Sequence, residues 1–130
     1  MFRLSRPLFQ ALKSTTGITG VAVHPSPIPA LLETYHATLA RLSEIPPTSV
    51  YRQGTEALTQ RKLSIVESAK GDVEKVEQDL DEGQIEEAIM IAKDELNLVG
   101  NMIQWKAWEP LEEKPQPGQW EYFGKTAEFK

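Results

Sequence analysis

A glutamate and a histidine in the N-terminal third of the sequence match part of a metal-binding motif. Glu33 and His36 form a Glu-x-x-His pair, the spacing with which carboxylate-bridged di-iron bundles place two ligands on one helix face. Such a site needs the pair twice, and the only other histidine, His24, lies in a proline-rich stretch near the N-terminus. We therefore interpret the pair as a surface contact one helical turn apart and expect no metal site.

Motifs for nucleophilic catalysis and phosphate binding are missing from the sequence. There is no cysteine, which excludes disulfides and thiolate ligands. The chain has no Gly-x-Ser-x-Gly elbow, no Gly-x-x-x-x-Gly-Lys-Ser/Thr loop and no Gly-x-Gly-x-x-Gly turn. We therefore expect a protein that is not an enzyme and that binds no cofactor.

A strongly acidic stretch is the next candidate site. Ten acids and two lysines lie between Asp72 and Glu95. The stretch does not fit a calcium loop, because its oxygen ligands, central glycine and twelfth-position glutamate are out of register. Two interpretations stay open, a solvated face or a docking surface for a basic partner. Because the net charge is −5 and nucleic-acid affinity depends on clustered bases, we expect no nucleic-acid partner.

Aromatic residues gather near the C-terminal end. Six of the ten aromatics lie in the last 26 residues, although Pro110, Pro115 and Pro117 oppose a helix there. A disordered linker is normally poor in aromatics, so this tail is expected to pack, either on its own bundle or on another chain. We expect Trp105 to pack on the bundle. The residues that we expect to bind a partner are Trp108, Pro110, Trp120, Tyr122 and Phe123.

The elements that must position these residues are helices. Apolar residues spaced by threes and fours favour a first helix that begins near Pro29 and stops at Pro46. Thr48 or Ser49 can cap a second helix, which we expect to be interrupted or bent near Gly54 and to end by residue 71.

A short third helical piece and a long fourth one follow. Asp72 can cap the short piece and Gly83 can close it. The strongest periodicity of the chain then favours a buried seam at Ile85, Ile89, Ala92, Leu96, Val99 and Ile103. We predict an all-α protein, a small antiparallel helical bundle of about three main helices over residues 29–106. An extended basic arm and linker (1–28) precede the bundle, and an extended aromatic tail with prolines and tryptophan (107–130) follows it.

The N-terminal arm differs from the remainder in charge. Up to Leu32 the chain carries three bases and no acid, whereas the remainder carries 11 bases and 19 acids. Residues 1–16 combine bases, apolar side chains and hydroxyls, a composition typical of mitochondrial targeting segments. A basic arm that is flexible or bound to a partner fits this composition equally well. The glycines and prolines of residues 17–29 predict a linker.

Six short motifs stand in a specific order and together cover about residues 31–120. They are Tyr51-Arg52-Gln53-Gly54-Thr55-Glu56, Leu63-Ser64-Ile65-Val66-Glu67, Gly83-Gln84-Ile85-Glu86-Glu87 with Ala92-Lys93-Asp94-Glu95-Leu96, Trp105-Lys106-Ala107-Trp108-Glu109-Pro110-Leu111, and Pro117-Gly118-Gln119-Trp120. In this order they resemble the family of a small accessory subunit of mitochondrial NADH:ubiquinone oxidoreductase, respiratory complex I. That family is called subunit 5 of the alpha subcomplex.

The resemblance implies a helical bundle on the matrix side of the mitochondrial inner membrane. The bundle is expected to attach to the hydrophilic arm of complex I near the quinone module, and to be peripheral to the membrane through the complex. The resemblance further implies a non-catalytic subunit without cofactors that supports assembly and stability. Its expected partners are core subunits of that arm, chiefly the 30-kDa-type subunit, and no homo-oligomer is expected. Residues 1–28 and 121–130 lie outside the pattern, so their roles stay open.

Two alternative functions come from other classes of protein. A small helical mitochondrial assembly factor with a Leu-Tyr-Arg motif recruits acyl carrier protein. Here the triplet is Val50-Tyr51-Arg52, and it opens the second helix instead of lying near the start of the first. A helical enzyme fits less well, because the histidines and loops that catalysis would use are missing.

Overall fold

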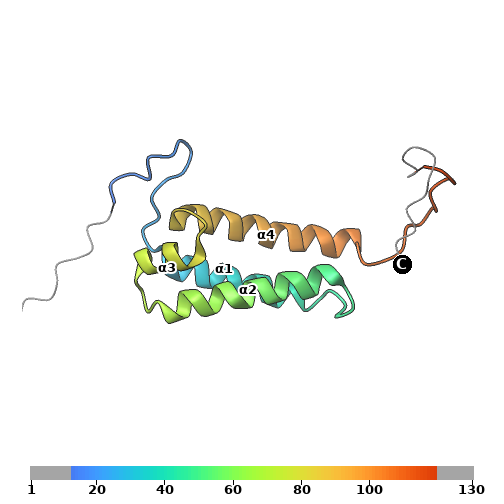
Figure 1. Ribbon diagram of the computed structural model, residues 1–130, viewed down its shortest axis with the longest axis horizontal. Coiled ribbons are helices and arrows are strands. Elements are labelled where there is room, and N and C mark those ends of the chain that lie inside the picture. The colour runs from blue at the N-terminus through green and yellow to red at the C-terminus, as the bar shows by residue number, and fades with distance from the viewer. Residues whose placement is uncertain (1–12, 120–130) are drawn as a thin grey trace, which may run out of the picture.

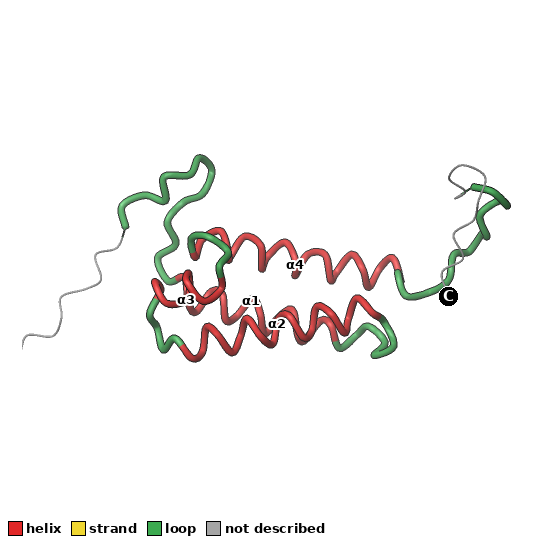
Figure 2. The backbone as a smooth tube through the Cα atoms, in the orientation of Figure 1, coloured by secondary structure: helices red, strands yellow, loops and turns green. Residues whose placement is uncertain are grey.

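Four α-helices make up the fold in a computed structural model, which describes residues 13–119 (Figure 1). They are α1 (Pro27–Leu42), α2 (Val50–Ser68), α3 (Val73–Leu80) and α4 (Ile85–Trp105). The part of the chain that the structure describes contains no strand. The three long helices lie side by side, α2 runs antiparallel to α1 and α4, and α3 closes one end (Figure 2). The prediction of an all-α bundle is confirmed.

Prolines determine both ends of α1. Pro27 occupies the first helical turn, where a missing N–H group leaves no bond unmade. The helix ends at Leu42, and residues 43–45 continue in tighter turns whose N–H groups donate to the carbonyl three residues back. The α-helix therefore stops earlier than predicted. Pro46 disfavours the α conformation at Ile45, the residue before it. The α-helix therefore gives way to tighter turns before the proline is reached.

α2 is one continuous helix from Val50 to Ser68, so the predicted interruption near Gly54 is wrong. Gly54 lies on the exposed side of α2, and nothing lies within 4 Å of the position that its Cβ would take. Its effect is therefore limited to a lower helix propensity, about 1 kcal/mol relative to alanine. The start of α2 is as predicted, because Oγ of Ser49 accepts a hydrogen bond from the Arg52 N–H at 3.5 Å.

Side-chain caps set the junction between α3 and α4. Asp72 caps α3, as predicted, by accepting a hydrogen bond from the Lys75 N–H. At the start of α4 a carboxylate oxygen of Glu87 accepts a hydrogen bond from the Gln84 N–H at 2.8 Å. Gly83, with a φ of 84°, leaves room for this carboxylate, since a Cβ there would lie 2.5 Å from it.

The core consists of two clusters of buried apolar side chains. The larger cluster lies at the α3 end of the bundle and includes Leu31, Tyr35, Val66, Val76, Ile85 and Ile89. The smaller cluster lies at the other end and consists of Leu42, Ile45 and Val99. None of the helices within residues 13–119 combines the length and the apolar composition that crossing a membrane requires.

The predicted seam of α4 is confirmed, although its positions are not all equally buried. Buried positions are Ile85, Ile89, Ala92 and Val99. Leu96 and Ile103 are only half-buried. α4 packs mainly against α1, so the seam faces α1 for most of its length.

Residues 13–26, which we name the N-terminal strap, pack against the bundle. The side-chain amide of Gln84 donates a hydrogen bond to the Thr16 carbonyl at 2.7 Å, and the Thr16 side chain is buried. Gly17 and Gly20 have φ values of 73° and 83°, so the glycines turn the chain here. Part of the stretch for which we predicted a linker therefore lies against the start of α4.

Candidate functional site

The Glu33 and His36 pair lies in solvent on α1. Both residues are exposed. Across residues 13–119 no three side chains of the metal-binding types come together in one place. Their exposed position agrees with a surface role, but within residues 13–119 the two side chains form no ion pair with each other, so the predicted contact between them is not found.

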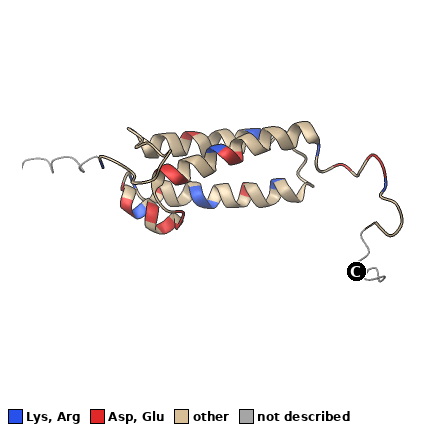
Figure 3. Cartoon of the chain, turned by 90° about the horizontal axis from the view of Figure 1, so that it is seen from above, with Lys and Arg blue, Asp and Glu red and all other residues tan. Residues whose placement is uncertain are grey.

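Most of the acidic stretch holds the fold together, which neither open interpretation anticipated. Aspartate and glutamate positions gather along α3 and at the start of α4 (Figure 3). Six of the ten acids bond within the protein: Asp72, Glu77, Glu82, Glu86, Glu87 and Glu95. The other four are exposed: Glu74, Asp79, Asp81 and Asp94. A basic partner would therefore meet a sparser set of carboxylates than the composition suggests.

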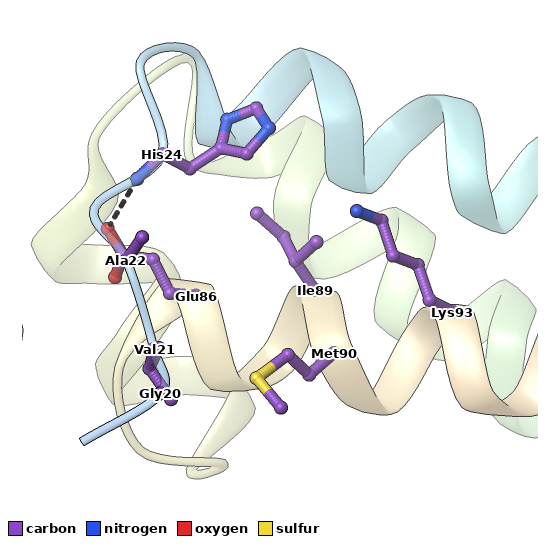
Figure 4. Close-up of a pocket in the computed structure, with 8 residues that line it drawn as sticks. All are labelled: Gly20, Val21, Ala22, His24, Glu86, Ile89, Met90 and Lys93. Atoms are coloured by element: carbon purple, nitrogen blue, oxygen red, sulfur yellow. Dashed lines mark hydrogen bonds between the residues drawn. The ribbon is translucent and has the colours of Figure 1, made fainter. Parts of the chain in front are cut away.

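Glu86 stands out among these acids because its side chain is only 4% exposed. Lys13 Nζ lies 2.5 Å from Glu86 Oε2, and the main-chain N–H of His24 donates to Glu86 Oε1 at 3.3 Å (Figure 4). Burial on its own would raise the pKa of Glu86. The hydrogen bonds and the positive charge of Lys13 outweigh burial and hold that pKa below its usual range. Glu86 is thus a buried carboxylate whose charge depends on the N-terminal strap.

Lys13 connects the N-terminal strap to both α3 and α4. Its Nζ donates to Gln84 Oε1 at 3.1 Å and lies 3.6 Å from Glu77 Oε1. Glu77 Oε1 also accepts a hydrogen bond from the Ile85 N–H at 2.8 Å. Burial lowers the pKa of Lys13, but its bonds to Glu86 and Glu77 raise the pKa overall. We name Lys13, Glu77, Gln84 and Glu86 the strap latch.

A small hollow lies where the N-terminal strap crosses α4 (Figure 4). The strap contributes Gly20, Val21, Ala22 and His24, and α4 contributes Glu86, Ile89, Met90 and Lys93. The carboxylate among these residues is already paired with Lys13. We therefore regard the hollow as part of the junction between strap and helix and assign it no ligand.

The C-terminal end of α4 places Trp105 differently from the prediction. Trp105 is 64% exposed, so the prediction that it packs on the bundle is wrong. It lies two residues after the seam position Ile103, which is about 200° further around the helix. Lys106 then adopts a left-handed conformation with a φ of 49°. After this turn Trp108 packs against the smaller core cluster.

The predicted partner-binding residues fall partly within the described residues. Trp108 is half-buried against the bundle, whereas Pro110 is exposed. The chain then leaves the bundle, and Leu111 is 73% exposed (Figure 1). Trp120, Tyr122 and Phe123 lie outside the described residues. The sequence-based set did not include Trp105 and Leu111, which add exposed apolar surface at this end.

The Val50-Tyr51-Arg52 triplet lies in the first turn of α2. Tyr51 Oη donates a hydrogen bond to Glu95 Oε1 at 2.5 Å, and burial together with this bond raises the pKa of Tyr51 above its ordinary value. Arg52 donates to the Ile45 carbonyl and forms an ion pair with Glu56. The two polar side chains of the triplet are thus engaged within the bundle.

Comparison with known proteins gives consistent matches over most of the chain. A family model described as "ETC complex I subunit conserved region" matches residues 20–87. The chain is 51% identical to NADH dehydrogenase (ubiquinone) 1 alpha subcomplex subunit MCI4 of Candida albicans, over 85% of this chain and 79% of the relative. It is 48% identical to subunit 5 of that subcomplex from Bos taurus, over 85% of this chain and 95% of the relative. The probable mitochondrial subunit 5 of Arabidopsis thaliana is 38% identical, over 81% of this chain and 62% of the relative.

Proposed function

The chain belongs to the family of alpha subcomplex subunit 5 of NADH dehydrogenase (ubiquinone), and on this premise we propose that it is a non-catalytic accessory subunit of mitochondrial respiratory complex I. In this role it supports the assembly and stability of the matrix hydrophilic arm near the quinone module. The observation that carries the proposal is the similarity, over 85% of the chain, to relatives that are named as alpha subcomplex subunits of NADH dehydrogenase (ubiquinone).

The proposed location is the matrix side of the mitochondrial inner membrane. The acid-free, basic composition of residues 1–16 supports a mitochondrial address. In this proposal the subunit is peripheral to the membrane and is held there by the complex. It acts without a cofactor and as a single copy.

The proposed partner is the core 30-kDa-type subunit of the hydrophilic arm, and the tail, residues 107–130, is the segment that binds it. Trp108 fixes the start of the tail to the bundle, and the chain beyond it leaves the bundle with Pro110 and Leu111 exposed. An extended segment with prolines loses less conformational entropy when it binds. Trp120, Tyr122 and Phe123 supply the aromatic side chains that commonly dominate binding free energy.

Native gels of solubilised mitochondria test the proposed role. A tagged copy of the chain should migrate with complex I, and loss of the chain should lower the amount of assembled complex. His36→Gln and Glu33→Gln should leave NADH:ubiquinone turnover per assembled complex unchanged, since both residues lie exposed on α1. Migration of the chain with acyl carrier protein, and not with complex I, would favour the assembly-factor alternative.

Trp120→Ala tests the proposed role of the tail. We expect it to weaken retention in complex I by about 2 kcal/mol or more, because tryptophan anchors carry a large share of interface binding energy. The thermal midpoint of the isolated chain should stay the same. The matched variant Trp108→Ala should lower that midpoint, because Trp108 packs on the smaller core cluster. Retention of Trp120→Ala at the wild-type level would contradict a binding role for Trp120.

A further inference from the structure

One side of α4 carries apolar side chains that the bundle leaves uncovered. Ile91, Leu98 and Trp105 follow one another at intervals of seven residues, so they lie on the same side of the helix about two turns apart. They are 45%, 37% and 64% exposed. The buried seam of α4 faces α1 from a different side of the helix. We name Ile91, Asp94, Leu98 and Trp105 the α4 outer strip.

The arrangement of these residues is more informative than their exposure. Single exposed apolar side chains are ordinary on a protein surface, whereas a row of them commonly marks an interaction site. The α4 outer strip extends over about 21 Å of helix. It ends in a tryptophan, the residue type most enriched among interface positions that dominate binding.

Asp94 adds a charge to the α4 outer strip. It lies three residues after Ile91 and four before Leu98, so its side chain projects from the same side of the helix. It is exposed and forms no ion pair with any residue of the described range 13–119. Burying a carboxylate against an apolar surface is unfavourable unless a basic group pairs with it. A partner that covers this strip must therefore bring a lysine or an arginine.

We propose that the α4 outer strip is a docking surface for a neighbouring subunit of complex I. The contacting element of that subunit presents apolar side chains to Ile91, Leu98 and Trp105 and one lysine or arginine to Asp94. This inference rests on the proposed function, which provides a neighbouring subunit. It adds a second contact region, separate from the tail beyond Trp108.

A second copy of this chain is a poor occupant of the α4 outer strip. After Leu32 the chain carries 11 bases and 19 acids, so two copies repel each other electrostatically. The strip itself offers a second copy a carboxylate and no base. A partner with a basic side chain satisfies Asp94 directly.

Photo-cross-linking in assembled complex I identifies what covers the strip. The probe is Leu98→p-benzoylphenylalanine in the full-length chain, and the matched control is the same change at Leu58. Leu58 is also an exposed leucine, but it lies on α2. We expect position 98 to cross-link to another complex I subunit more strongly than position 58 does. Cross-links from position 98 to a second copy, to this chain's own C-terminal segment, or to nothing would overturn the inference.

Surface variants measure how much the strip contributes. The double variant Ile91→Ser with Leu98→Ser should weaken retention of the full chain in complex I by about tenfold, whereas Leu58→Ser should not. Asp94→Lys should weaken retention by a similar factor, because two bases would then meet, and Asp79→Lys on α3 serves as its control. Thermal midpoints equal to that of the wild type show that these variants are folded.

Retention in complex I distinguishes a failure of the proposed function from a failure of the α4 outer strip as a docking surface. If the wild-type chain does not migrate with complex I, the proposed function itself is wrong. If the wild type is retained and the strip variants are retained equally well, the function stands and the α4 outer strip is not a docking surface.

Discussion

At the scale of single residues, the strap latch explains how this bundle tolerates a buried carboxylate. Glu86 lies in the first turn of α4, where the helix dipole and free N–H groups favour a negative charge. That position alone does not compensate for burial, and Lys13 provides the missing positive charge at 2.5 Å. The N-terminal strap is therefore held by electrostatics as well as by its turn.

Replacing Lys13 should reveal the strength of the strap latch. Lys13→Met leaves the buried Glu86 without its counter-charge, so we expect the free energy of unfolding to fall by about 1 to 3 kcal/mol. Urea denaturation of the isolated chain measures this change. The control Lys75→Met alters an exposed lysine on α3 and should change stability by less than about 0.5 kcal/mol. Equal effects of the two variants would show that the latch does not stabilise the fold.

The pH dependence of the free energy of unfolding should also reveal the Lys13–Glu86 ion pair. The folded-state pKa of Glu86 is depressed below the usual 4.5, so its contribution is present above about pH 4.5 and is lost as the pH falls through the folded-state value. The wild type should therefore lose its stability advantage over Glu86→Gln in acid. The folded-state pKa of Lys13 is raised above 10.5, so its contribution is lost only in strong base. Thermal midpoints of both proteins between about pH 3 and pH 7 test the acid limb, and a constant difference would contradict the assignment.

Sequence patterns could not reveal the strap latch, for a physical reason. Helix periodicity and capping are local, whereas Lys13 and Glu86 are far apart in the sequence and are brought together only by the fold. One local signal was present, because Glu86 directly follows Ile85 and precedes Ala88 and Ile89 in an apolar run. A carboxylate inside such a run is a candidate for burial with a partner.

At the scale of elements, local chemistry accounts for most of the helix boundaries. Ser49 and Asp72 cap α2 and α3 as expected from their types and positions. The errors arose where position around the helix or exposure decided the outcome. Gly54 lies in solvent and does not interrupt α2, and Trp105 faces away from the seam because of its angular position.

Positions in the seam of α4 look equivalent in the sequence but differ in burial. We therefore predict that substitutions there lower the free energy of unfolding by different amounts. Ile89 is buried in the larger core cluster, so Ile89→Ala should lower the free energy of unfolding by about 2 to 5 kcal/mol. Leu96 is half-buried, so Leu96→Ala should have a smaller effect, about 1 to 2 kcal/mol. Denaturant melts of the two variants provide the comparison. A larger loss for Leu96→Ala would mean that the register of α4 is wrong.

At the scale of the whole molecule, α4 connects the N-terminal strap, α1 and the start of the tail. The N-terminal strap is fastened at its first turn, α1 covers its seam, and Trp108 packs back beyond its last turn. Its outer strip remains uncovered along its length. A change in the way α4 packs would therefore affect the strap and the start of the tail together.

We expect the N-terminal segment to have two functions, which a pair of deletions can separate. Targeting composition extends over residues 1–16, but Lys13 and Thr16 also bond to the bundle. Deleting residues 1–12 should abolish mitochondrial import and leave the thermal midpoint of the purified chain unchanged. Deleting residues 1–16 should also lower the midpoint, by about 5 °C or more, because the strap latch is lost. Import assays and thermal melts of the two chains provide the measurements. Normal import without residues 1–12 would contradict the targeting hypothesis, whereas equal midpoints for the two deletions would show that the strap latch contributes little to stability.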